Sequence, residues 1–264
     1  MRVVHPARRT PAPDTLEVLH RGAGNWASSR AHAKTTVEWD EWRARGQAIR
    51  DDAVRHLPEL LDELEANVTA AGGVVHRAAD AAAARAVVRE LCDGPAVKAK
   101  SMLADEIGLD VDAVETDLGE WIIQLLGDRP SHILAPAIHV SAERVADLFS
   151  RHSGERYDAA DTGRLVGYAR ETLRQAFLEA EVGITGVNFA VAATGTLILV
   201  ESEGNIRLCT SLPRRHLALM GIEKVLRDWE AAAHMMQLLP LAAHGKPAAT
   251  YTSLITGVGG DDGP

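Results

Sequence analysis

Apolar residues recur at spacings of three and four positions between Ile49 and Val68, the period of a helix with one buried stripe. Pro58 lies inside this stripe, where its missing N–H interrupts the hydrogen bonds of a continuous helix. We therefore predict either a kink at Pro58 or two abutting helices. The stripe consists of Ile49, Ala53, Leu57, Leu60, Leu64 and Val68.

Beyond residue 72, short apolar runs alternate with helical periods, as they do in β-α-β units. This pattern predicts an α/β fold with a mainly parallel, Rossmann-like sheet flanked by helices. Between Phe189 and Leu212 the runs are separated by turn residues alone, which indicates a hairpin or meander insertion. The predicted strands are Val74–His76, the run through Val97, Ala113–Thr116, Ile133–Ala135, Val182–Thr185, Leu197–Val200, Ile206–Thr210 and Leu217–Met220. The predicted helices are Ala79–Cys92, Leu118–Leu126, Ala142–Phe149, Arg164–Ala180 and Glu223–Leu239.

These patterns divide the chain into three parts. Residues 1–30 are rich in Pro, Arg, Gly and Ser and lack an apolar period, which is typical of a mobile tail. Residues 31–71 form a helical segment that we expect to pack on the main domain. Residues 72–264 form the α/β domain itself.

The composition excludes several classes of protein. A net charge of −9 gives a surface that repels phosphate backbones, so we expect no nucleic-acid partner. No apolar stretch is long enough to be a transmembrane segment, and no apolar run follows Arg8-Arg9 as a signal peptide requires, so we expect a cytoplasmic protein. Cys92 and Cys209 form no C-x-x-C pair, which favours free thiols and predicts no metal site.

Familiar site motifs are missing, so the chemistry is expected at strand ends. We find no G-x-G-x-x-G, Walker, H-E-x-x-H or G-x-S-x-G motif. Open α/β sheets bind ligands at the carboxyl ends of their strands. Lys98 and Lys100 follow a predicted strand and precede a helix start at Ser101, a place that attracts carboxylates or phosphates; a solvated strand end explains them equally well. Thr116 or Asp117 can cap the next helix, with Glu120 three residues beyond Asp117, and helix capping explains this cluster adequately.

A second polar group surrounds the predicted strand Leu197–Val200. Arg207 suits a carboxylate, and Glu203 can take or give a proton; a charged hairpin tip explains the same residues without a function. We assign catalysis to Glu203 and His216, and substrate binding to Lys98, Lys100, Thr194, Gly195, Thr196, Gly204, Asn205 and Arg207. We expect Lys98, Lys100, Glu203, Asn205, Arg207 and His216 to converge on one cleft, with Arg207 making the main contact to a small monocarboxylate ligand.

Six long blocks of the sequence occur in the order typical of the LUD domain family. The chain resembles this family from about Ala31 to Gly257, and within it the N-terminal half of the lactate utilization protein B family. It departs from the pattern at Ala193, where the family has a glutamate before Thr-Gly-Thr, and the segment Ile107–Val114 is shorter than expected. The blocks are residues 97–109, 114–125, 129–139, 177–208, 212–225 and 250–257.

The resemblance implies a fold similar to the sugar-phosphate isomerase and CoA-transferase group. It also implies a place in a multi-protein system that oxidises L-lactate to pyruvate, with other lactate utilization subunits as partners and no activity of this chain alone. The family's two four-iron (4Fe-4S) clusters belong to a downstream ferredoxin-like segment beyond Pro264 or to partners, so we expect no cofactor in this chain. Two cysteines are too few, since a four-iron cluster needs four thiolates. A noncatalytic assembly module, or an independent isomerase or transferase acting on a phosphorylated small molecule, remain as alternatives.

Overall fold

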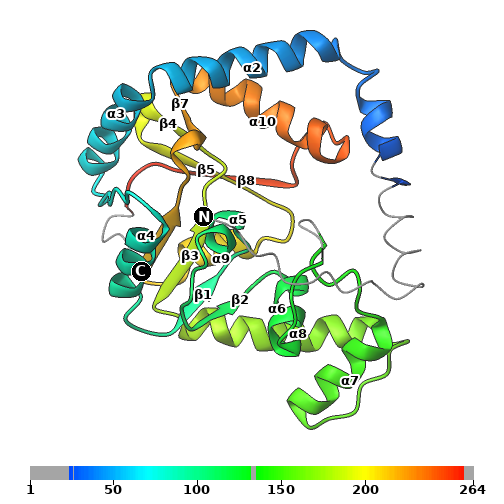
Figure 1. The fold of residues 1–264 in the computed structure, drawn as a ribbon. Coiled ribbons are helices and arrows are strands. Elements are labelled where there is room, and N and C mark those ends of the chain that lie inside the picture. The colour runs from blue at the N-terminus through cyan, green and yellow to red at the C-terminus, as the bar shows by residue number, and fades with distance from the viewer. Residues whose placement is uncertain (1–23, 26, 132–134, 259–264) are drawn as a thin grey trace.

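The computed structural model describes residues 24–25, 27–131 and 135–258, and its strands form two four-stranded sheets within these ranges. The α/β class predicted from the sequence is confirmed, but the strands are divided between two sheets (Figure 1). Sheet A is parallel throughout, in the order β2 (Ala113–Glu115), β1 (Ala96–Lys98), β3 (Val182–Gly186) and β6 (Arg215–Leu219). Sheet B is mixed, in the order β7 (Val225–Leu226), β4 (Phe189–Val191), β5 (Thr196–Glu201) and β8 (Tyr251–Ile255).

The central strands β1 and β3 of sheet A are almost wholly buried, as expected for a parallel sheet covered on both faces, whereas the edge strand β6 is only partly buried. On one face Val97 belongs to a core cluster with Trp121 and Phe149, whose ring centroids are 5.3 Å apart. On the other face the neighbouring Ala96 packs in a separate cluster with Val88. The helices around this sheet are α4 (Ala81–Leu91), α5 (Met102–Glu106), α6 (Leu118–Leu126), α7 (Ala142–Ser153), α8 (Thr162–Glu179) and α9 (Asn205–Ser211).

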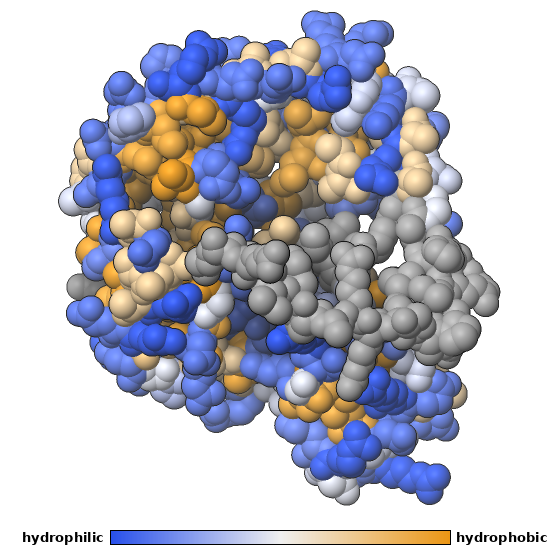
Figure 2. Space-filling view, viewed as in Figure 1, coloured by the Kyte–Doolittle hydropathy of each residue, from blue (hydrophilic) through white to orange (hydrophobic). Residues whose placement is uncertain are grey.

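Sheet B lies against three longer helices (Figure 1). The predicted break at Pro58 is confirmed, because one helix ends at Arg55 and the next begins at Leu57 with the proline in its first turn. Leu60 and Leu64 of the predicted stripe pack in one cluster with strands of this sheet. Figure 2 shows apolar patches below α2 on a face that is otherwise mostly hydrophilic where it is described. The elements are α2 (Trp39–Arg55), α3 (Leu57–Ala70) and α10 (Trp229–His244), with 3₁₀ turns η1 (Ala192–Thr194) and η2 (Ile222–Lys224).

Two predicted strands are wrong, and one predicted helix begins later than expected. Val74–His76 is not a strand; Val74 is 79% exposed and the segment has no pairing partner in sheet A or B. The predicted strand Ile206–Thr210 is part of helix α9. The helix predicted from Glu223 begins only at Trp229, where Asp228 caps it by accepting a hydrogen bond from the Ala231 N–H at 2.9 Å.

The error at residues 206–210 is explained by Glu201, which lies outside the predicted segment. Both oxygens of the buried Glu201 carboxylate accept hydrogen bonds from the backbone N–H groups of Ile206 and Arg207, at 2.7 and 3.2 Å. Gly204 turns the chain with a φ of 81°, in the left-handed region that suits glycine. These contacts start a helix, and its Ile206 and Cys209 then point into the core on one side.

Two predictions fall wholly or partly outside the described residues. The strand predicted at Ile133–Ala135 overlaps residues 132–134, and most of the predicted N-terminal tail lies in residues 1–23 and 26. The described residues 27–33 are helical.

Candidate functional site

A buried ion pair marks the carboxyl edge of sheet A. Lys98 and Glu115 are the last residues of β1 and β2 and are direct partners in the strand register. Lys98 Nζ lies 2.6 Å from Glu115 Oε1, and the two side chains are only 10% and 15% exposed. Glu115 Oε2 is also buried but has no hydrogen-bond partner in the described chain. Burial raises the pKa of Glu115, and the charge of Lys98 opposes this effect.

The start of α9 is docked on this edge through Thr116. The Thr116 hydroxyl donates to the carbonyl oxygen of Lys98 at 3.1 Å, and it accepts a hydrogen bond from Asn205 Nδ2 at 3.1 Å. Both polar functions of the buried hydroxyl are therefore used. The structure thus brings Lys98 and Asn205, which are 107 positions apart in number, to the same edge.

The start of helix α6 adds two carboxyl groups. Asp117 accepts a hydrogen bond from the Glu120 N–H at 3.1 Å, which confirms the predicted cap. Glu203 Oε2 accepts a longer one from the Leu118 N–H at 3.4 Å. Although much of Glu203 is exposed, its carboxyl end turns toward this helix start, and partial desolvation together with the charge of Asp117 raises the pKa of Glu203.

Glu120 is the least satisfied carboxyl group of the edge. The residue is 9% exposed, and its side chain forms no hydrogen bond or ion pair with the described chain. Burial, together with the negative charges of Glu115 and Asp105, raises the pKa of Glu120 to about 7 against the opposing charge of Lys100. A carboxyl group that titrates near neutral pH is suited to proton transfer.

Lys100 is a half-buried cation without an ion-pair partner among the described residues. Its ammonium group makes no ion pair or hydrogen bond with the described residues, whereas Lys98 is held by Glu115. Its charge acts on both Glu120 and Glu203. Just beyond it, Ser101 caps α5 by accepting a hydrogen bond from the Ala104 N–H, as the sequence predicted.

Arg207 and His216 have other surroundings. The Arg207 guanidinium lies over the ring of Tyr251 in sheet B, 5.4 Å from its centroid. His216 lies near the beginning of β6, and its Nε2 is 2.7 Å from the Thr185 hydroxyl. Burial lowers the pKa of His216 to about 4, so the ring is neutral at physiological pH. The structure therefore brings Lys98, Lys100, Glu203, Gly204 and Asn205 together. Arg207 borders this group, because a Cβ at Gly204 would lie 3.7 Å from its guanidinium, whereas His216 lies near the amino ends of the strands of sheet A.

The Thr194-Gly195-Thr196 turn lies at the opposite end of β5 from Glu201. Gly195 has a φ of 69°, and a Cβ there would lie 2.7 Å from the backbone nitrogen of Val68 in α3. The hydroxyls of Thr194, Thr196 and Thr256 form a chain with distances of 2.8 and 2.6 Å. These contacts explain the turn by packing, and Ala193 beside it is exposed.

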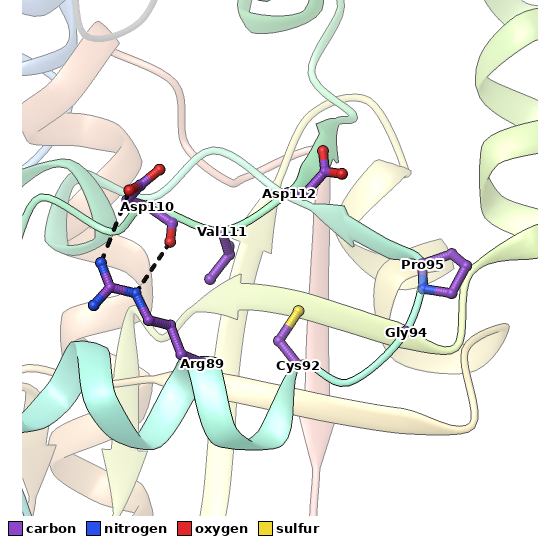
Figure 3. Close-up of a pocket in the computed structure, with 7 residues that line it drawn as sticks. All are labelled: Arg89, Cys92, Gly94, Pro95, Asp110, Val111 and Asp112. Atoms are coloured by element: carbon purple, nitrogen blue, oxygen red, sulfur yellow. Dashed lines mark hydrogen bonds and ion pairs between the residues drawn. The ribbon is translucent and has the colours of Figure 1, made fainter.

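A pocket of about 480 Å³ lies at the amino ends of β1 and β2, away from the polar edge (Figure 3). Its Arg89 guanidinium is 3.8 Å from the Asp110 carboxylate. Burial and the neighbouring Asp93 raise the pKa of the Cys92 thiol, which makes it a weak nucleophile. The lining residues are Arg89, Cys92, Gly94, Pro95, Asp110, Val111 and Asp112.

The two thiols do not fit an iron–sulfur cluster. Cys209 is fully buried with Val97 on one face of sheet A, whereas Cys92 packs with Ala96 on the other. The sheet separates them, so they cannot bind the same cluster. Within the described residues, no three His, Cys, Asp or Glu side chains are placed to hold a metal ion.

Sequence reasoning missed Glu115 and Glu120 as site residues because capping was a sufficient explanation for residues 115–120. Two signals point to them. Glu115 ends a strand beside the strand that ends in Lys98, and Glu120 interrupts the apolar face of the helix that carries Trp121 and Ile123. Both signals need the strand neighbours or the buried helix face to be known.

The sequence of this chain is similar to a known family of proteins. The family model described as "LUD domain" matches residues 61–261. The chain belongs to the LUD domain family. Lactate utilization protein B of Shouchella clausii is 39% identical over 247 residues, which cover 88% of this chain and 52% of that protein. For the Bacillus subtilis protein of the same name the identity is 37% over 268 residues, covering 92% and 55%.

The LUD-domain chain spans about half the length of the curated relatives it matches. No solved structure matches it. Among the described helices, none has the length and apolar character needed to cross a bilayer.

Proposed function

We propose that this chain acts in lactate utilization by binding a small hydroxy or keto acid at the carboxyl edge of sheet A. The electrons of L-lactate oxidation are then carried by partner subunits or by the half of the relatives that this chain does not span. The names of the relatives support a role in lactate utilization. The polar groups at the carboxyl edge of sheet A support the binding of a small acid. The single observation that carries the ligand is Lys100, a half-buried ammonium group without an ion-pair partner in the described chain, beside carboxyl groups with raised pKa values.

Each polar group of the edge has a role in this proposal. Lys100 attracts the carboxylate, and Asn205 and the Gly204 backbone, at the start of the helix docked on the same edge, orient the hydroxyl or keto oxygen. Glu203 is the proposed proton acceptor, because it is near Lys100 and its pKa is raised toward the working range. Arg207 is displaced from the main contact, since its guanidinium already lies over Tyr251.

The test compares two cations by calorimetric titration with L-lactate and pyruvate. Lys100→Met should weaken binding by about 10-fold or more, because a charge-assisted contact contributes roughly 1.5–3 kcal/mol. Arg214→Met removes the same charge from an exposed position just before β6, at the amino ends of the strands of sheet A, and should change affinity by less than about 2-fold, because an exposed cation contributes little. Equal affinity in Lys100→Met and wild type would reject the assigned contact, and binding of a sugar phosphate in preference to both acids would reject the ligand class.

A further inference from the structure

The carboxyl edge of sheet A holds more carboxyl groups than cations. Glu115 of β2, Asp105 of α5, Asp117 at the start of α6, and Lys100 all act electrostatically on Glu120. Across the edge, Glu203 faces Asp117 and Lys100. A bound carboxylate adds another negative charge to this partly desolvated group, where like charges repel strongly. Binding is therefore favoured if one carboxyl group takes up a proton.

The contacts single out the group that is easiest to neutralise. Glu115 is held in its charged form by Lys98 at 2.6 Å, and Asp117 accepts a helix N–H at 3.1 Å. Glu203 accepts the Leu118 N–H at 3.4 Å, a contact that favours its charged form although burial and the charge of Asp117 raise its pKa. Glu120 makes none of these contacts and is nine-tenths buried, so only the charge of Lys100 offsets the hydration that its charged form loses.

We propose that a small monocarboxylate bound at Lys100 causes Glu120 to take up a proton from solution. This inference rests on the proposed function, because it requires the acid to bind at this edge. The proton comes from the buffer, and the bound complex holds a neutral Glu120 beside the ligand's carboxylate. The site thereby selects monoanions, since a dicarboxylate or a phosphate dianion would bring a second charge that one proton does not offset.

The size of the uptake follows from the titration of the free protein. With a pKa of about 7, Glu120 is about half ionised at pH 7 and roughly nine-tenths ionised at pH 8. Binding should therefore take up about 0.5 proton per ligand at pH 7 and about 0.9 at pH 8. Above pH 7 the affinity should fall by up to about tenfold per pH unit.

The experiment titrates wild-type protein with pyruvate in buffers of equal pH and different ionisation enthalpy. The slope of binding enthalpy against ionisation enthalpy gives the protons taken up. Glu120→Gln should show an uptake near zero and an affinity that is flat between pH 7 and 9. Glu106→Gln removes the same charge from an exposed position of α5 and should keep the wild-type uptake.

The outcomes separate the two proposals. Binding by wild type without proton uptake, or an uptake that is unchanged in Glu120→Gln, overturns the inference and leaves the proposed function standing. Failure of wild type to bind pyruvate or L-lactate at either pH overturns the proposed function and the inference with it. Wild-type binding without proton uptake overturns the inference even if a variant is poorly folded, and the comparison with Glu120→Gln assigns an observed uptake to Glu120.

Discussion

The carboxyl edge of sheet A and the Thr-Gly-Thr turn of sheet B are both polar groups of residues beside a strand. They differ in whether their buried polar atoms have hydrogen-bond partners. At the turn, the hydroxyls of Thr194, Thr196 and Thr256 bond to one another. At the edge, a buried oxygen of Glu115 has no partner in the described chain, and neither has the Glu120 side chain. Because an unsatisfied buried group costs stability, this difference favours the edge over the turn as the proposed ligand site.

The largest expected effect tests the edge. Lys98→Met should lower the free energy of unfolding by about 3–5 kcal/mol at pH 8, because it leaves the Glu115 charge buried and unpaired. The pKa of Glu115 is raised in the fold, so its charged form is absent at low pH and the loss should shrink as the pH falls toward 5. Urea unfolding at both pH values measures this.

The control for this prediction is Lys224→Met, which breaks an exposed ion pair with Glu223 and should cost less than about 1 kcal/mol. Similar losses in the two variants would show that the edge pair is no more important than a surface pair.

The next effect tests the turn. Gly195→Ala should cost about 3 kcal/mol, from the left-handed backbone and from the contact of the new Cβ with α3. Gly127→Ala has a similar φ of 60° but open space around its Cβ, so it should cost only about 1 kcal/mol. Urea unfolding measures both losses. Equal losses of unfolding free energy in the two variants would show that close packing of Gly195 against α3 does not explain the glycine.

The smallest expected effect is at the carboxyl edge of sheet A, where a substitution should raise the free energy of unfolding instead of lowering it. Glu120→Gln should stabilise the protein by about 1–2 kcal/mol at pH 8, because the variant cannot acquire the uncompensated charge. The pKa of Glu120 is raised to about 7 in the fold, so the cost of its charge is absent below the unfolded pKa of about 4.3 and develops as the pH rises through 7. The gain should therefore vanish near pH 4.5. Stabilisation of the same size at both pH values would contradict an electrostatic origin.

Much of the fold could be read from local signals. The caps at Ser101 and Asp117, the break before Pro58 and the alternation of strands with helices are confirmed, because each depends on residues within a few positions of one another. The segment 206–210 was misread as a strand because its helix is started by Glu201, which lies outside the segment.

The residues of the candidate site also fall into those found from local sequence patterns and those found only from tertiary contacts. Local sequence patterns correctly placed Lys98 and Lys100 at the end of a strand, where open α/β sheets bind ligands, but they placed Asn205 before a strand where the structure has helix α9. Only the tertiary structure decided that Arg207 lies over Tyr251, that the Thr-Gly-Thr turn packs on α3, and that Glu120 is buried beside Glu115. The physical reason is that capping and periodicity act over a few residues, whereas burial and charge are set by segments up to about a hundred residues apart that the two sheets bring together.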